Sequence, residues 1–319
     1  MMKTAVIPIF YGINDQYAPY LAASLQSLLT HLNPEQKYQV IVLYQKLTLA
    51  NQQRLGKMAT DNCPITFYQL TPDLLTQFGG DDNTLRADYF TLTIYYRLFI
   101  ADLFPEYDQG VYLDADTIIT TDIAQLAQQD LGSHLIGAIP DAFICSDPRT
   151  RRYAELAVGV DPDHYINSGV LLLNLKALRA EKFSQHFLKL LNQYHFQLIA
   201  PDQDYLNGIC YGRTTYLGPT WNLQTEHALP VAGQPAIVHY NLFGKPWCYA
   251  EVPYADLFWQ FADQTDYQDE LRAQLAQYSP SQTAADAEHK DLLMQRIIAF
   301  PDETFTFKQA RAQGEQVQL

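Results

Sequence analysis

In the segment Val111-Tyr112-Leu113-Asp114-Ala115-Asp116-Thr117, two carboxylates stand two residues apart where an apolar run meets a turn. Side chains at positions i and i+2 of a strand point to the same side. Asp114 and Asp116 could therefore face one divalent cation, and that cation could hold a phosphate-bearing substrate. Taken alone, the pair is equally compatible with a solvated turn or a helix-capping site.

Strand-like and helical segments alternate on the N-terminal side of this acidic pair. Residues 4–10, 38–44 and 64–70 have the apolar character of buried strands, whereas residues 21–32 and 49–59 have helical character. Such alternation predicts an α/β fold with a largely parallel sheet.

Further elements follow the same alternation towards the C-terminus. A helix over 89–103 leads into the strand 110–113, and the later segments are the strands 135–139 and 168–173 and the helices 183–194 and 201–210. From residue 263 the chain is polar, Gln-rich and predicted to be helical. We therefore expect one domain over 1–262 and a helical extension over 263–319 that packs on it or forms homo-oligomers.

Composition excludes several classes of protein. The chain has 319 residues and a net charge of −14, which argues against nucleic-acid binding because phosphate neutralisation needs dense Lys and Arg. It also argues against docking on anionic lipid. No apolar stretch approaches the length of about 18 residues that a transmembrane helix needs, and no secretory leader is evident. The four cysteines lie far apart without a C-x-x-C pair, so we expect buried thiols and a cytoplasmic protein.

A second candidate site is His239-Tyr240-Asn241-Leu242-Phe243-Gly244-Lys245-Pro246-Trp247, which follows the apolar run 236–238. A histidine at a strand end can bind a metal, and a lysine six residues later can meet a phosphate as a point charge. The alternative for His239 is a core histidine with a satisfied hydrogen bond. Combined with the two aspartates, it would complete a ligand set that suits Mn²⁺ better than Mg²⁺, which takes mostly oxygen.

Three shorter motifs carry polar side chains near predicted strand or helix ends. Arg97 could contact a phosphate or a sugar hydroxyl, or form a surface salt bridge. Asn167-Ser168-Gly169-Val170 opens an apolar strand with small polar residues. Asp202-Gln203-Asp204 begins a helix, where N-capping and the helix dipole also favour acids.

The acidic pair also resembles the first motif of haloacid-dehalogenase-type phosphatases, in which the first Asp is a nucleophile and the second a general acid. That motif normally ends the first strand of the core domain. Here three strand–helix units precede Asp114, and no later acidic pair follows a strand in the required order. We therefore place this alternative well below a cation site.

Taken in order, the motifs resemble the retaining glycosyltransferases of family 8, which include bacterial lipopolysaccharide α-galactosyltransferases, glycogenins and general stress protein A-like proteins. The resemblance covers residues 3–250 and includes the opening segment 7–21. It implies the GT-A fold, with a mixed, mostly parallel central sheet flanked by helices and a helical C-terminal extension. It also implies transfer of galactose or glucose from a UDP-sugar to an acceptor hydroxyl with retention.

The resemblance assigns roles to individual residues. It implies that Asp114, Asp116 and His239 hold Mn²⁺ (or Mg²⁺) and that Lys245 and the backbone near it bind phosphate. The implied nucleotide-binding residues are Asn14, Asp15 and Tyr17. The implied donor-sugar and catalytic residues are Arg97, Asp141, Asn167, Ser168, Asp202 and Gln203.

Two departures from the family pattern affect the first loop and the phosphate loop. Asn14 and Gln16 stand where the family often has an acid and an asparagine, although an amide oxygen can still accept from the uracil N3–H. Leu242 occupies a position that is glycine in some members. These departures leave open a nucleotide-sugar-binding protein with little transferase activity.

The acceptor remains open at this point among glycans, lipid-linked glycans and proteins. A lipid-linked acceptor would bring the cytoplasmic protein to the membrane periphery. For the reaction we favour front-face attack, with the leaving phosphate helping to accept the proton of the acceptor hydroxyl, over a double displacement.

Overall fold

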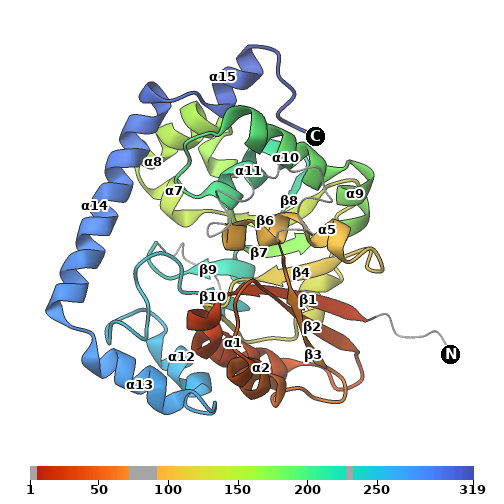
Figure 1. Cartoon of the computed structure of the whole chain (residues 1–319), viewed down its shortest axis with the longest axis vertical. Coiled ribbons are helices and arrows are strands. Elements are labelled where there is room, and N and C mark those ends of the chain that lie inside the picture. Colours follow the sequence, from red (N-terminus) through yellow and green to blue (C-terminus); the bar gives the residue numbers. More distant parts are fainter. Residues whose placement is uncertain (1–5, 72–91, 228–232) are drawn as a thin grey trace. The chain divides into compact units, whose positions relative to one another are not determined.

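The computed structural model describes residues 6–71, 92–227 and 233–319. The chain divides into two compact units, each assembled from three separate segments (Figure 1). Unit 1 contains Met1–Gln69, Gln109–Asp130 and Gly218–Asp286, and unit 2 contains Leu70–Asp108, Leu131–Leu217 and Ala287–Leu319.

Unit 1 is built on parallel strands in the order β3 (Ile65–Gln69), β2 (Tyr38–Tyr44), β1 (Ile7–Ile13) and β4 (Gly110–Leu113). The residues of β2 and β4 are nearly all buried. Strands that are covered on both faces need apolar side chains in succession, which explains the continuous apolar runs in the sequence. The predicted parallel α/β arrangement is confirmed here, apart from residues 4 and 5 of the first predicted strand, which lie outside the described residues.

Helices α1 (Ala18–His31), α2 (Leu49–Gly56) and α12 (Ala255–Ala262) belong to the same unit. α1 buries Leu21, Leu25 and Leu28 and contacts α12. This confirms the helix that was predicted over 21–32. The helix predicted over 49–59 ends at Gly56, three residues early, and its first turn is capped by the Thr48 hydroxyl, which accepts from the amide of Asn51.

A smaller sheet in unit 1 was not predicted. Its central strand β10 (Ile237–His239) runs antiparallel to β5 (Thr117–Ile119) and parallel to β9 (Leu223–Gln224). His239 pairs with Thr117 in the register of β10 with β5. The next backbone amide, that of Tyr240, donates to the carbonyl of Asp116 at 3.0 Å. This pairing therefore places residues more than a hundred positions apart side by side.

Unit 2 contains β6 (Ile136–Pro140), which pairs antiparallel with β7 (Ile166–Leu173) and parallel with β8 (Thr214–Tyr216). Every residue of β7 is buried. The strands predicted over 135–139 and 168–173 are therefore confirmed, with β7 starting two residues earlier. The pairs described for β1 to β4 in unit 1 are parallel, and unit 2 has one antiparallel and one parallel pair.

The helices of unit 2 include the predicted pair α10 (Phe183–Tyr194) and α11 (Pro201–Cys210), which both begin and end as expected. α10 buries Phe187, Leu190 and Leu191. Further short helices are α6 (Ala124–Ala127) in unit 1, and α7 (Ala142–Ser146), α8 (Pro148–Tyr153) and α9 (Leu175–Ala180) in unit 2.

The continuous helix predicted over 89–103 is wrong. Residues 89–91 lie outside the described part of the chain, Leu92–Leu98 form a 3₁₀ helix, and α5 (Ile100–Leu103) is a single turn after Phe99. The segment is rich in β-branched and aromatic residues, which are weak helix formers. Its burial in the core therefore decided the local structure.

The C-terminal part is helical, as predicted, with α13 (Gln268–Gln277), α14 (Pro280–Glu303) and α15 (Phe307–Ala312) (Figure 1). α13 belongs to unit 1 and α15 to unit 2, where Phe307 is fully buried. The division at residue 262 stays a prediction. Within the described residues, no helix is both long and apolar enough to cross a membrane.

Candidate active site

The acidic pair lies directly after β4, at the carboxyl end of a parallel strand, where open α/β sheets bind ligands. The Thr117 hydroxyl donates to the carbonyl of Asp114 at 2.8 Å and shapes the turn. The Tyr112 hydroxyl donates to Asp114 Oδ1 at 2.9 Å. The Asp114 carboxylate and the turn that carries it are thus held by neighbours on the same segment.

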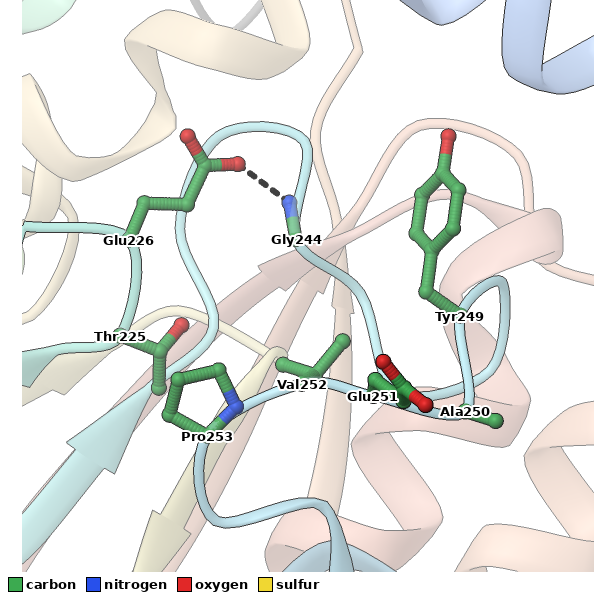
Figure 2. A pocket seen from close by; sticks show the side chains of 8 residues that line it. All are labelled: Thr225, Glu226, Gly244, Tyr249, Ala250, Glu251, Val252 and Pro253. Atoms are coloured by element: carbon green, nitrogen blue, oxygen red, sulfur yellow. Dashed lines mark hydrogen bonds between the residues drawn. The ribbon is translucent and has the colours of Figure 1, made fainter.

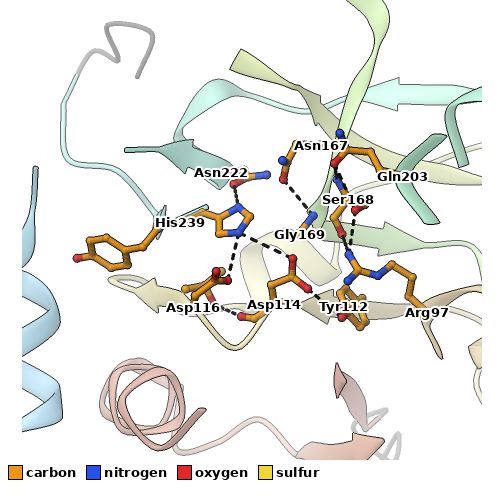
Figure 3. Close-up of polar contacts among 12 residues, drawn as sticks. Arg97, Tyr112, Asp114, Asp116, Asn167, Ser168, Gly169, Gln203, Asn222 and His239 are labelled. Carbon is orange, nitrogen blue, oxygen red and sulfur yellow. Dashed lines mark hydrogen bonds and ion pairs between the residues drawn. The ribbon is translucent and has the colours of Figure 1, made fainter. Parts of the chain in front are cut away.

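His239 ends β10 and faces this pair (Figure 3). Its Nε2 lies 3.2 Å from Asp116 Oδ1 and 3.8 Å from Asp114 Oδ2. One ligand atom of each residue lies within 4.8 Å of the others. The structure thus brings together the three residues that the sequence suggested as metal ligands.

Asn222 orients the imidazole, and sequence reasoning missed it. Its amide oxygen lies 3.0 Å from His239 Nδ1, and both side chains are buried (Figure 3). Because this oxygen can only accept, Nδ1 carries a hydrogen, and Nε2 is the ring nitrogen that faces the carboxylates. Metal-binding histidines are commonly fixed in this way by a second partner. No motif marks Asn222, which comes from the 3₁₀ helix Pro219–Asn222.

Lys245 contacts the acidic pair from the loop after β10. Its Nζ lies 2.6 Å from Asp116 Oδ2 and 2.5 Å from the carbonyl oxygen of Tyr240. Burial alone would lower the pKa of Lys245, but the Asp116 carboxylate outweighs it and raises that pKa. Burial likewise opposes ionisation of Asp116, yet Lys245 and His239 together lower the pKa of its carboxyl well below the ordinary value. Asp116 and Lys245 are therefore both charged.

These residues fit a divalent cation by their chemistry. Asp116 is ionised, Asp114 offers a partly exposed carboxylate, and Nε2 of His239 is the ring nitrogen that a cation could take as a ligand. Mixed carboxylate and imidazole ligands suit Mn²⁺. Three protein ligands would leave further positions on the cation for water or phosphate oxygens.

The first loop of unit 1 holds the residues that the sequence assigned to the nucleotide. Asn14 Oδ1 accepts from the amide of Tyr17 at 3.2 Å. Asp15 Oδ1 accepts from the amide of Thr48 at 2.7 Å and from Asn51 Nδ2 at 3.0 Å. Slight burial opposes ionisation, but these bonds lower the pKa of Asp15 overall. Asp15 thus ties the loop to α2.

An aromatic series connects this loop to the Lys245 segment. The Tyr17 side chain is exposed to 39% and meets Tyr20 edge-on, with ring centroids 5.4 Å apart. Tyr20 stacks on Trp247 at 3.9 Å. Tyr17 therefore has a partly exposed ring that packs edge-on against Tyr20.

Unit 2 brings together the remaining predicted residues. Asp202 and Gln203 lie in the first turn of α11, directly after Pro201. Asp202 Oδ2 lies 3.0 Å from Arg97 Nε and accepts from the Ser168 hydroxyl at 3.1 Å. Gln203 Oε1 accepts from the Ser168 amide at 2.9 Å (Figure 3). The beginnings of α11 and β7 are thus joined through side chains.

Asp141 completes this network from the N-cap of α7. Its Oδ1 accepts from the Ile144 amide at 2.9 Å. Its Oδ2 accepts from Asn167 Nδ2 at 2.9 Å and Gln203 Nε2 at 3.0 Å. The residues that share this unit 2 network are Arg97, Asp141, Asn167, Ser168, Asp202 and Gln203.

Asp204 lies next to this network in α11 and holds the region through buried hydrogen bonds. Its fully buried carboxylate accepts from the hydroxyls of Tyr165 at 2.7 Å and Tyr153 at 3.0 Å, and from the Ala200 amide at 3.1 Å. Burial raises the pKa of Asp204 to about 7. Asp204 thus accepts from the amide of Ala200, the N-cap residue of α11, although this helix has no side-chain N-cap hydrogen bond.

Comparison with known proteins identifies the family. The sequence model of glycosyl transferase family 8 matches residues 8–251, which is most of the chain. The chain belongs to glycosyl transferase family 8. A family 8 enzyme is a glycosyltransferase, so this membership overturns the phosphatase interpretation of Asp114 and Asp116.

Several characterised relatives are similar over most of their length. General stress protein A of Bacillus subtilis (strain 168) is 25% identical and covers 84% of this chain and 96% of its own. The lipopolysaccharide 1,2-glucosyltransferase of Escherichia coli (strain K12) is 25% identical, covering 75% and 72%. The lipopolysaccharide 1,3-galactosyltransferase of Salmonella typhimurium (strain LT2) is 27% identical over 75% of this chain and 72% of its own length.

Solved structures confirm the predicted GT-A fold of this family 8 chain. The galactosyltransferase LgtC, determined with donor and acceptor sugar analogues, matches with a TM-score of 0.67 at 24% identity, over 84% of this chain and all of LgtC. The bifunctional glycosyltransferase WbbM matches with a TM-score of 0.73 at 22% identity. The match covers 86% of this chain and 52% of WbbM.

Proposed function

We propose that this family 8 glycosyltransferase moves a hexose, galactose or glucose, from a UDP-sugar to an acceptor hydroxyl with retention, using Mn²⁺ or, less well, Mg²⁺. The observation that carries the proposal is the cluster of Asp114, Asp116 and His239 with Lys245 beside it. Two carboxylates, an imidazole and an ammonium group in one place suit a metal–diphosphate complex.

The nucleotide would bind at the first loop of unit 1. Tyr17 offers its half-exposed ring to uracil, and the Asn14 amide can accept from the base. Both hydrogen bonds described for Asp15 go to Oδ1, so Oδ2 is the oxygen that we assign to a ribose hydroxyl.

The diphosphate would be neutralised by positive charge at the acidic pair. A divalent cation there would offset the negative charge that develops on the leaving phosphate. Lys245 would shift its ammonium from Asp116 to a phosphate oxygen and add a charge-assisted hydrogen bond.

The donor sugar would bind the unit 2 network, which offers carboxylate, amide and guanidinium groups. Asp202 is ion-paired with Arg97 and hydrogen-bonded to Ser168, which weakens it as a nucleophile, and Gln203 is an amide. We therefore favour front-face attack. The bond from the anomeric carbon to the acceptor oxygen forms, the bond to the phosphate oxygen breaks, and the acceptor proton passes to the leaving phosphate.

The acceptor that we propose is a glycan, carried by a lipid or a protein. Two relatives are named as lipopolysaccharide glycosyltransferases, which motivates a sugar acceptor. We also propose a cytoplasmic location, consistent with four free cysteines, and homo-oligomers formed through 263–319. Light scattering of the full chain at several concentrations tests the last point, and a monomer throughout would contradict it.

A screen of UDP-sugars tests the reaction itself. We expect slow, Mn²⁺-dependent release of UDP from UDP-galactose or UDP-glucose even without an acceptor, and none in the presence of a chelator. Binding of a UDP-hexose without release in the presence of acceptor glycans would instead favour a nucleotide-sugar-binding protein. A covalent sugar adduct that disappears in Asp202→Asn would overturn front-face attack.

A further inference from the structure

The loop after β10 contains a backbone site for an anion. Leu242 adopts the left-handed conformation, with φ 57°. The next two amides, of Phe243 and Gly244, both donate to Glu226 Oε1, the former at 2.7 Å. Figure 2 shows the contact of Gly244 with Glu226. Successive amides that converge on one oxygen form the kind of concave site that binds carboxylates and phosphates.

Gly244 fits closely against the bound carboxylate. A Cβ atom at this position would lie 3.1 Å from Glu226 Cγ and 3.3 Å from Oε1. Any larger residue would therefore push the carboxylate away from the amides. Because Glu226 follows β9 and the amides follow β10, the contact joins two segments that are neighbours through the small sheet.

Lys245, the next residue, likewise binds a carboxylate of the protein itself. Its Nζ binds Asp116 Oδ2, so the ammonium group of this loop also contacts a carboxylate of the protein. The loop thus has two kinds of anion-binding group, amides and an ammonium. Each of them is engaged by an internal carboxylate, one from Glu226 and one from Asp116.

We propose that Glu226 competes with phosphate oxygens for the amides of Phe243 and Gly244, which lie in the backbone near Lys245 that the family resemblance already assigns to phosphate. In the absence of ligand the carboxylate occupies the amides, and a diphosphate must displace it. The identity of the ligand as a nucleoside diphosphate rests on the proposed function, whereas the competition by Glu226 rests on the loop alone.

A cavity beside the loop gives the displaced side chain a place to go. It has a volume of about 560 Å³ and is lined by Thr225, Glu226, Gly244 and the segment 249–253 (Figure 2). Glu226 can therefore leave the amides by rotating its side chain, without a change in the fold of unit 1. The Glu251 side chain lies on the same cavity but makes no contact with the two amides among the described hydrogen bonds.

The competition has a measurable consequence. When the binding-competent state is only a fraction of the population, the apparent dissociation constant rises by the inverse of that fraction. A neutral amide accepts less strongly than a carboxylate. Glu226→Gln should therefore tighten phosphate binding, and a closed state of about 90% would give about a tenfold gain.

Calorimetry with UDP, pyrophosphate and uridine, each with Mn²⁺, tests the proposal on the full chain. We expect Glu226→Gln and Glu226→Ala to bind UDP and pyrophosphate about tenfold more tightly than the wild type, with uridine unchanged. Glu251→Gln is the matched control, since it removes one negative charge from the same cavity without freeing the amides. Thermal melting checks that each variant is folded.

The outcomes separate this inference from the proposed function. If UDP binds the wild type and Glu226→Gln equally, or if Glu251→Gln produces the same gain, the competition by Glu226 is wrong while the nucleotide site stands. A different result would be that pyrophosphate binds Glu226→Gln more tightly than the wild type, while UDP binds no more tightly than pyrophosphate to the wild type or to any variant. The competition by Glu226 would then stand, and the uridine specificity of the proposed function would fail.

Discussion

The amide oxygen of Asn222 lies 3.0 Å from Nδ1 of His239, and both side chains are buried. This contact fixes the imidazole with Nε2 towards Asp114 and Asp116, at 3.8 and 3.2 Å from their nearest oxygens. A residue without a recognisable motif therefore determines the direction in which a predicted metal ligand points.

Asn222→Ala should weaken Mn²⁺ binding about 10- to 100-fold, the usual cost of losing a residue that orients a metal ligand. Without the amide the imidazole can rotate or change tautomer. Titration of free Mn²⁺ by electron paramagnetic resonance measures this affinity without any need for catalysis. Asn174→Ala is the control, because Asn174 caps α9 in unit 2. Equal losses in both variants would point to a general structural effect.

Asp116→Asn should abolish Mn²⁺-dependent UDP binding while leaving the chain folded. The substitution preserves shape but removes the ionised ligand that faces both His239 and Lys245. We expect a loss beyond about 100-fold, more than an orienting residue costs. In calorimetry, Asp122→Asn should behave as wild type, because that carboxylate serves Tyr38 and the start of α6 instead. Unchanged affinity in Asp116→Asn would remove the acidic pair from the site.

Lys245→Met should separate phosphate binding from metal binding. Loss of a charge-assisted bond to phosphate should weaken UDP binding about 10- to 100-fold. Binding of Mn²⁺ alone should not weaken, because the ammonium group that contacts Asp116 at 2.6 Å is gone. The exposed Lys37 provides the control variant, Lys37→Met. A parallel loss of Mn²⁺ affinity in Lys245→Met would contradict the assignment of this lysine to phosphate.

Asp204 should make stability depend on pH. Burial raises its pKa from 3.8 to about 7 in the folded chain, so between these values the folded state binds a proton that the unfolded state has released. Stability is therefore lost as pH rises from about 4 to 7, by up to about 4 kcal/mol at about 1.4 kcal/mol per pKa unit. Asp204→Asn cannot ionise and should lack this component.

Urea unfolding at pH 5 and pH 8 measures the effect as a difference between the two proteins. The stability of Asp204→Asn relative to wild type should improve at the higher pH. The same difference at both pH values would show that the carboxyl of Asp204 ionises in the folded chain as it does in the unfolded one.

Much of the fold was predictable because its signals are local. The strands β2 and β7 contain the apolar runs 40–43 and 170–173, since both of their faces are covered, and the helices α10 and α11 were placed at their observed bounds. The segment 92–103 was mispredicted, because its apolar periodicity does not distinguish an α-helix from a 3₁₀ helix followed by a single α-turn.

The candidate site was predictable in its residue types but not in its contacts. Asp114, Asp116 and Lys245 stand out by charge beside apolar runs. Asn222 and Glu226 do not, because their importance depends on what lies opposite them in space. Asp15 was expected to contact the nucleotide, and the structure adds that it fastens its loop to α2.

By itself, the sequence determined the order of strands and helices, the presence of paired carboxylates at a strand end and the family to which the chain belongs. These properties depend on periodicity and on motifs within short segments. The tertiary structure alone decided that β10 pairs with β5, and hence that His239 meets Asp116 and that Glu226 meets the amides of Phe243 and Gly244. Such contacts arise from strand register between segments about a hundred positions apart or from loops that neighbouring strands carry, and no local pattern encodes that register.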